Sequence, residues 1–387
     1  MRIYLDHNAT TPLDPLVVDR MALAMREVWG NTSSVHHFGQ QAKAALDEAR
    51  AAVATLLGAE ASEVVFTCGG TESDNIAIRG AAEALEAGGR RHLITSAIEH
   101  EAVLATIKAL ARRGARVTIL PVDASGIVSP ERLREAITDD TALVSVMHAN
   151  NEIGTIQPIA ELAAIAHERG ALFHTDAVQS AGKLPLDVRA LGVDMLSIAG
   201  HKFYGPKGTG ALWLRRGVRL VPPMTGGRQE RNRRAGTENV PALVGLGVAA
   251  EVARQKLAGE AARLGALRDR LEAGLLAGVP GSERNGAAAP RVPNTSNISV
   301  DGIESESLLI GLDLAGIAVS SGSACSSGTL EPSHVLKAMG LPHGRTLGSI
   351  RFSLGASNTA ADIDRVIEVL PPLVEKLRRL TTVGGRN

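Results

Sequence analysis

Short apolar runs alternate with helical patterns over residues 62–214, and this alternation constrains the fold more than any other feature. Many of the runs are rich in β-branched residues, which favour strands. Strands that alternate with amphipathic helices form βαβ units, whose strands lie mostly parallel in one sheet. The pattern therefore predicts a large α/β domain. The expected strands are residues 64–66, 92–95, 116–120, 143–147, 171–174 and 195–198.

A second, smaller α+β domain is predicted beyond a long helix at residues 250–276. A stretch broken by Gly and Pro follows this helix over residues 278–293, where helical and strand patterns stop. The expected division gives residues 15–255 to the large domain, and residues 1–14 and 256–387 to the small one. Other expected elements are helices at 40–57, 129–137, 304–314 and 362–380, strands at 297–300 and 349–353, and a mobile loop at about 318–332.

Composition narrows the class of protein. Lys and Arg number 41 and Asp and Glu also number 41, so no charge excess favours nucleic acid or a membrane surface. The longest uncharged apolar stretch, residues 242–250, is too short to cross a bilayer, and an acid follows closely on the N-terminus. We therefore expect a cytoplasmic protein. Its two cysteines exclude a disulfide framework and a zinc site built from cysteines alone.

The segment around Gly69, Gly70 and Thr71 carries the first candidate site, because a strand there turns into a helix through two glycines. Free amides at a helix N-terminus bind anions, most naturally a phosphate. An ordinary strand-to-helix turn is the alternative. Cys68 precedes the glycines, and we interpret it as a small buried residue without a nucleophilic role.

Two further strand ends carry Asp176 and Lys202. A buried carboxylate is stable when it faces a cation, and Gln179 follows Asp176 by three residues. A lysine shielded from water loses proton affinity and becomes a usable nucleophile. A helix cap and a surface lysine are the alternatives. A phosphate site, a buried acid and a lysine are together the groups that hold pyridoxal phosphate.

The segment around Cys325 is rich in Gly and Ser, so this cysteine reads as a mobile thiol and not as core packing. An inert cysteine in a linker is the alternative. Arg351 lies in an expected strand, where a guanidinium could grip a carboxylate. Asn151 follows an apolar strand, and His100 could stack on a ring or transfer protons. Each of these three residues, taken alone, is also compatible with a structural role.

Taken together, the motifs closely resemble those of cysteine desulfurases of the NifS/IscS type. The resemblance covers nearly the whole chain in order, and the Ser-Gly-Ser-Ala-Cys loop is its most specific part. It implies a homodimer with the aspartate aminotransferase-like fold of pyridoxal-phosphate enzymes. The segments that carry it are DHNATT (6–11), GTESDN (70–75), EH (99–100), NNEIG (150–154), DAVQ (176–179), GHK (200–202), RAGTEN (234–239), SGSAC (321–325) and RFS (351–353).

The resemblance also implies roles for single residues. Lys202 would bind the cofactor covalently, Asp176 would pair with its ring nitrogen, and Gln179 would contact its ring hydroxyl. His100 would stack on the ring and move protons, and Thr237 would reach the phosphate in the neighbouring subunit. Asn151 and Arg351 would bind the substrate carboxylate. The full expected cofactor set is Gly70, Thr71, His100, Asn151, Asp176, Gln179, His201, Lys202 and Thr237.

The implied reaction removes sulfur from L-cysteine, leaving L-alanine and a persulfide on Cys325. Sulfur would then pass to acceptor proteins for iron-sulfur cluster assembly or for thiolation of tRNA or cofactors. No metal of its own is expected, although Cys325 could transiently ligate a cluster shared with a scaffold. A selenocysteine lyase and a class V aminotransferase remain alternatives. Three positions depart from the family pattern, and the first is expected to lower cofactor affinity: Ala199 and Cys68, each in place of serine, and Thr32 in place of proline.

Overall fold

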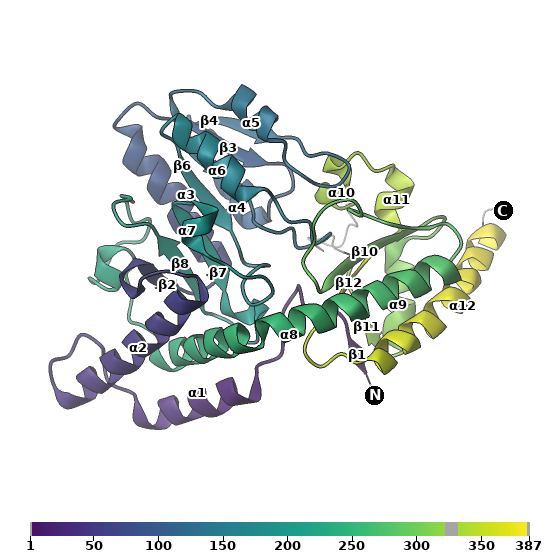
Figure 1. The fold of residues 1–387 in the computed structure, drawn as a ribbon, viewed down its shortest axis with the longest axis horizontal. Coiled ribbons are helices and arrows are strands. Elements are labelled where there is room, and N and C mark those ends of the chain that lie inside the picture. Colours follow the sequence, from purple (N-terminus) through teal and green to yellow (C-terminus); the bar gives the residue numbers. More distant parts are fainter. Residues whose placement is uncertain (1, 322–331, 385–387) are drawn as a thin grey trace.

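The computed structural model describes residues 2–321 and 332–384, and its largest feature is a seven-stranded sheet (Figure 1). The strands follow the order β2-β8-β7-β6-β5-β3-β4, in which β8 is antiparallel to β2 and β7 and the other pairs are parallel. This arrangement confirms the predicted mostly parallel α/β sheet. The strands are β2 (Val64–Thr67), β3 (His92–Ser96), β4 (Arg116–Leu120), β5 (Thr141–Ser145), β6 (Leu172–Asp176), β7 (Met195–Ala199) and β8 (Gly210–Leu214).

Helices follow the strands as the alternation predicts, and polar caps set several of their starts. The Ser129 hydroxyl accepts from the Arg132 amide at the start of α5, where Pro130 occupies the first turn. Helix α2 begins earlier than expected because the His36 ring accepts from the Gly39 amide. These helices are α1 (Pro15–Glu27), α2 (His37–Leu56), α3 (Gly70–Glu86), α4 (Glu101–Ala111), α5 (Pro130–Ala136), α6 (Ile159–Glu168) and α7 (Val188–Leu191).

Helix α8 (Val240–Gly278) is longer than the expected helix at residues 250–276. Its first part is apolar on most sides because it is enclosed by α1, α2 and the core beneath the large sheet, so it shows no amphipathic stripe there. The Asn239 side chain accepts from the Ala242 amide and starts the helix. Figure 1 shows α8 crossing from α1 and α2 to α12.

The other end of the molecule contains two small sheets, β12-β10-β9 and β1-β11. The pair β1-β11 was not predicted, because strands of two residues are too short to show a period. Strand β1 brings the N-terminal segment beside β12, which also bonds to it through Asp6 and Ser353. The elements are β1 (Ile3–Tyr4), β9 (Ser282–Arg284), β10 (Thr295–Val300), β11 (Ile317–Ala318), β12 (Ser349–Ser353), α9 (Ser305–Leu314), α10 (His334–Ala338), α11 (His343–Leu347) and α12 (Ala360–Gly384).

One apolar core includes the start of α8, and another includes its end. One fills the space between the large sheet and helices α2, α6 and the start of α8. Another joins the end of α8 to β10, β12, α9 and α12. The exact domain bounds stay a prediction. Within residues 2–321 and 332–384, no helix combines the length and apolar character needed to span a membrane.

Candidate functional site

A cavity of about 380 Å³ opens where strands β5, β6 and β7 end. Open α/β sheets bind ligands at this carboxyl edge, because loops and helix N-termini meet there. The cavity brings together nine residues that the sequence analysis selected from distant segments. They are Gly70, Thr71, His100, Asn151, Asp176, Gln179, His201, Lys202 and Arg351.

The N-terminus of α3 forms one wall of this cavity. Gly69 has a φ of +151°, and no side chain caps the helix, so the first amides have no partner within it. A Cβ on Gly70 would lie 2.7 Å from Val178 Cγ2, so glycine keeps this approach open. Thr71 lines the cavity beside these amides. The wall therefore offers an anion both N–H donors and the positive end of a helix dipole.

Cys68 is exposed, so the prediction of a buried small residue is wrong. Strand β2 ends at Thr67, and Cys68 is the first residue of the turn, where its side chain leaves the sheet core. Its amide donates to Glu72 Oε2 at 2.6 Å. Partial desolvation and the Glu72 carboxylate raise the pKa of the thiol, which opposes formation of a thiolate.

Asp176 ends strand β6, and both it and Asp74 from α3 line the cavity. Burial, followed by the repulsion from Asp176, raises the pKa of Asp74 well above its usual range. Burial also raises the pKa of Asp176, but His100 and Lys202 oppose this effect. Of the two carboxyls, the rise in pKa is the stronger at Asp74, and a cationic ligand group beside Asp176 would favour the charged form of Asp176.

Lys202 lies just after strand β7, and its Nζ donates to the main-chain oxygens of Asn8 at 2.6 Å and Ala9 at 2.8 Å. Burial, together with Arg351, lowers its pKa to about 8. A neutral amine is therefore accessible near neutral pH, as a nucleophile requires. His201 beside it has a pKa lowered to about 4 by burial and by the neighbouring lysines, so its ring is neutral.

His100 caps helix α4, where its Nδ1 accepts from the Ala102 amide at 3.1 Å. An imidazole nitrogen that accepts carries no proton, so the ring proton of the neutral form lies on Nε2. The cap also fixes where the ring lies, beside the cavity that it lines. His100 thus caps helix α4 and also lies where it can contact a ligand in the cavity.

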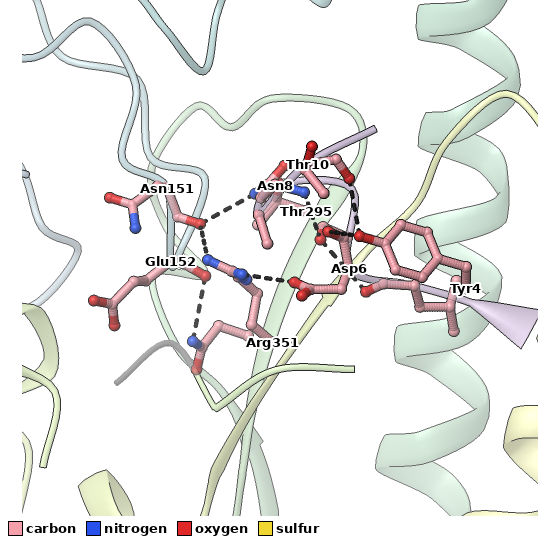
Figure 2. A network of polar contacts seen from close by, with 12 residues as sticks. Tyr4, Asp6, Asn8, Thr10, Asn151, Glu152, Thr295 and Arg351 are labelled. Atoms are coloured by element: carbon pink, nitrogen blue, oxygen red, sulfur yellow. Dashed lines mark hydrogen bonds and ion pairs between the residues drawn. The ribbon is translucent and has the colours of Figure 1, made fainter. Parts of the chain in front are cut away.

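Arg351 lies on β12 and reaches the cavity from the small sheets (Figure 2). Its Nη1 donates to the Asn151 main-chain oxygen at 3.0 Å and its Nη2 donates to Asp6 Oδ1 at 2.7 Å. Asn8 Nδ2 donates to the same Asn151 oxygen at 3.1 Å. These contacts hold a buried guanidinium at the mouth of the cavity, where a carboxylate ligand would meet a positive charge.

Of the predicted residues that the structure describes, Thr237 does not line the cavity. Thr237 is exposed in the segment before α8, and a single chain does not test its expected reach into a neighbouring subunit. Cys325 lies outside the described residues. Thr32, one of the departures from the family pattern, donates to Glu238 Oε2 at 2.9 Å, next to Thr237. Ala199, another departure, lines the cavity with a methyl group where a hydroxyl would have been a donor.

Sequence reasoning assigned no role to three residues that shape this site: Asn8, Asp74 and Lys183. Asn8 and Asp74 stand inside motifs that carried the resemblance, but neither has a spacing that marks a chemical role. Lys183 follows Gln179 by four residues, and its amine donates to the Gln179 Oε1 atom at 2.7 Å. That spacing is the one signal that could have suggested their contact.

The arrangement fits pyridoxal phosphate. The α3 amides suit its phosphate, the buried Asp176 carboxylate suits a protonated ring nitrogen, and the Lys202 amine suits its aldehyde. The cavity also has the size of a small-molecule site. A ligand without a phosphate would leave the α3 amides without a partner. One without a protonated nitrogen or an aldehyde would likewise leave the Asp176 carboxylate or the Lys202 amine without one.

Comparisons with known proteins agree with this geometry. The Aminotransferase class-V family model matches residues 3–366. A cysteine desulfurase from Gluconacetobacter diazotrophicus is 52% identical over 381 residues, covering 98% of this chain and 95% of that protein. Cysteine desulfurase IscS from Methanosarcina thermophila is 52% identical over 379 residues, covering 98% of this chain and 93% of that protein.

Solved structures have the same fold. A NifS-like protein superposes with a TM-score of 0.89 at 38% identity, covering 99% of this chain and 100% of its own. A second structure, SspA in complex with cysteine, has a TM-score of 0.81 at 37% identity, covering 92% of this chain and 99% of its own. These likenesses confirm the fold expected from the motifs.

Proposed function

This chain belongs to the aminotransferase class-V family and is a cysteine desulfurase, and we propose that it works with pyridoxal phosphate and forms a persulfide on Cys325. One observation carries the cofactor assignment. A single cavity joins the free amides of α3, the buried Asp176 and the Lys202 amine, and these match the three polar parts of this cofactor.

The cofactor supplies an electron-withdrawing ring, which stabilises negative charge on the substrate carbon that bears the amine. Asp176 would face the ring nitrogen and favour its protonated form, while burial and the Asp176 carboxylate raise the pKa of Asp74 more strongly. Gln179 would donate an N–H toward the ring hydroxyl, and His100, which also lines the cavity, would stack on the ring. His100 presents Nε2–H, since its Nδ1 is occupied by the α4 cap.

Lys202 moves the proton of the substrate. Its Nζ, when free, would take the proton from the α-carbon of the substrate. A pKa of about 8 lets the amine both accept and return a proton near neutral pH. The main-chain oxygens of Asn8 and Ala9 accept from Nζ in the cofactor-free chain and would offer the free amine a position to occupy when it is not bonded to the cofactor.

Arg351 and Asn151 bind the substrate carboxylate and so orient its sulfur. Cys325 then attacks that sulfur as a thiolate. The bond between the substrate carbon and sulfur breaks as the sulfur–sulfur bond forms, and the carbon takes up a proton to give L-alanine. The carbon is reduced while the sulfur is oxidised, so the step needs no external oxidant or reductant.

The partners follow from the product. A persulfide must be passed on, so the proposal includes acceptor proteins such as an iron-sulfur scaffold or a tRNA-thiolation protein. It also includes a homodimer, in which Thr237 reaches the phosphate bound by the other subunit, and a cytoplasmic location. The relative named IscS supports the link to iron-sulfur cluster assembly.

The test uses purified protein with added pyridoxal phosphate and L-cysteine. We expect equimolar alanine and sulfide when a thiol reductant is present, and a visible absorbance band from the bound cofactor. Lys202→Ala should lose this band and the activity. Lys207→Ala is the matched control, because that lysine is exposed and lies outside the cavity lining.

Cys325→Ala separates the proposed route from its alternatives. We expect this variant to keep the visible band and to lose alanine formation from cysteine. Alanine release at the wild-type rate would instead indicate a lyase or an aminotransferase that does not need the thiol.

A further inference from the structure

Lys183 is a buried lysine that lines a separate small pocket together with Lys202, and the proposed mechanism does not use it. It lies in the turn that follows strand β6, four residues after Gln179. Gly182 has a φ of +73°, and a Cβ there would lie 2.6 Å from Phe203 Cβ. The glycine therefore lets the chain turn tightly, and this turn brings Lys183 back under Gln179.

The Lys183 amine is held by two amide oxygens. Its Nζ donates to Gln179 Oε1 at 2.7 Å and to Asn8 Oδ1 at 2.9 Å. Among the described residues, no carboxylate lies within ion-pair distance of it. Burial, followed by repulsion from Lys202 and Arg351, lowers its pKa well below the usual range. An amine kept in such a place at this cost suggests a specific positioning role.

Gln179 can lie in only one orientation because its two contacts agree. The side-chain oxygen must face the Lys183 amine, which donates. The side-chain nitrogen must face the Asn8 main-chain oxygen, which can only accept, and the two atoms are 3.0 Å apart. The remaining N–H of Gln179 is then available to a ligand, since Gln179 lines the cavity. A ligand oxygen beside it receives a hydrogen bond.

Asn8 connects Lys183 to Lys202, because it accepts hydrogen bonds from both amines. Its side-chain oxygen accepts from Lys183 and from Asn294 Nδ2, the latter at 3.1 Å. Its main-chain oxygen accepts from both Gln179 and Lys202. The Lys183 amine thus fixes one residue that donates into the cavity and supports a second that holds the Lys202 amine.

We propose that Lys183 is a positioning residue, whose amine orients Gln179 so that its N–H meets an acceptor oxygen of the cofactor. This proposal rests on the proposed function, because the acceptor is the ring hydroxyl oxygen of pyridoxal phosphate. Lys183 itself touches neither the cofactor nor the substrate. Its effect on cofactor binding must therefore pass mainly through Gln179.

The test measures the equilibrium dissociation constant of the cofactor-free protein for pyridoxal phosphate, followed by visible absorbance. Lys183→Met keeps the length of the side chain and removes the amine. We expect about tenfold weaker binding, since a buried amide oxygen loses its donor and Gln179 loses its orientation. Lys256→Met is the matched control, because Lys256 is exposed on α8 and pairs with Asp14. It should stay within about twofold of the wild type.

A double-mutant cycle with Gln179→Ala identifies the route of the effect. In the Gln179→Ala background, Lys183→Met should change the affinity by less than about threefold, because the residue through which it acts is absent. The wavelength of the cofactor band should shift in Lys183→Met and not in Lys256→Met. If Lys183→Met does not fold, Lys183→Gln retains a donor and should weaken binding in the same direction by less.

The outcomes separate this inference from the proposed function. Wild-type affinity in Lys183→Met, or the same tenfold loss with and without Gln179, would overturn the positioning role and leave the proposed function intact. A wild-type protein that binds no pyridoxal phosphate would overturn the proposed function, and this inference with it.

Discussion

At the scale of single residues, Asp74 and Asp176 are two buried carboxyl groups with different surroundings. Burial raises the pKa of both, but His100 and Lys202 oppose the rise at Asp176, whereas Asp176 and Glu99 add to it at Asp74 and only a hydrogen bond from Ser197 opposes it there. One of two adjacent buried carboxyls must stay protonated when both cannot be solvated. The environment therefore favours the neutral state more strongly at Asp74 than at Asp176.

This difference predicts that replacing each carboxyl by an amide affects cofactor binding to different extents. Asp74→Asn mimics a protonated carboxyl and should keep the affinity for pyridoxal phosphate within about threefold of the wild type. Asp176→Asn removes the charge that faces the ring nitrogen and should weaken binding by about tenfold or more. Titration of the cofactor-free proteins measures both. Equal losses in the two variants would contradict the assignment.

Glu99 predicts a dependence of stability on pH. Burial raises its pKa from 4.5 to about 8, although Ser96 and the Met147 amide donate to the carboxylate. A raised pKa in the folded state means that the stability it contributes is complete below pH 4.5. That contribution is then lost as the pH rises through 8, with an upper limit of about 5 kcal/mol.

Glu99→Gln removes this titration. We expect the free energy of unfolding of the wild type to fall between pH 5 and pH 8.5 relative to the variant, as measured with urea at several pH values. Glu86→Gln is the control, because Glu86 is exposed and pairs with Arg91 at the surface. Parallel pH profiles for wild type and Glu99→Gln would show that Glu99 keeps its usual pKa.

At the scale of elements, α8 contains glycines in contrasting surroundings. A Cβ on Gly247 would lie 2.6 Å from Ala49 Cα in α2, whereas nothing lies within 4 Å of one on Gly259. Gly247→Ala should lower the free energy of unfolding by about 1–3 kcal/mol, because α2 and α8 must separate. Gly259→Ala should raise it by about 0.5–1 kcal/mol through helix propensity. Urea unfolding of both variants checks this, and the same sign for both would contradict it.

Sequence periodicity predicted elements where one face is apolar and the other polar. It located six of the seven strands of the large sheet, together with helices α5 and α9, within a few residues, but it predicted no strand at β8 (Gly210–Leu214). It missed the first turns of α8, because residues enclosed on most sides have no polar face to mark the period. It missed β1 and β11, which pair with each other although they lie more than three hundred positions apart in the chain.

At the scale of the whole molecule, the proposed site needs a second subunit. Thr237 is exposed and stands outside the cavity of its own chain, so its proposed contact with a phosphate requires another copy. We expect sedimentation equilibrium to give twice the mass of one chain across a dilution series. A monomer with full desulfurase activity would contradict this prediction.

The motifs identified which residues meet in the cavity, but not how they hold one another. Asn8 and Lys183 are separated by 175 positions, yet their side chains share a hydrogen bond. Nothing in a motif states that contact, because it depends on how the turn after β6 packs against the N-terminal segment. The exposure of Cys68 was not predicted either, because it depends on strand β2 ending one residue earlier, at Thr67.

Helix α8 has a consequence for cooperativity. Its 39 residues form a continuous rod of about 58 Å, with Leu246 packed in one core and Leu271 in the other. Melting either core would expose apolar residues on half of this helix and remove the support of the rest. Neither core can therefore be lost without weakening its neighbour. Calorimetry should accordingly record one heat-absorption peak, even though α8 contributes to two separate apolar cores.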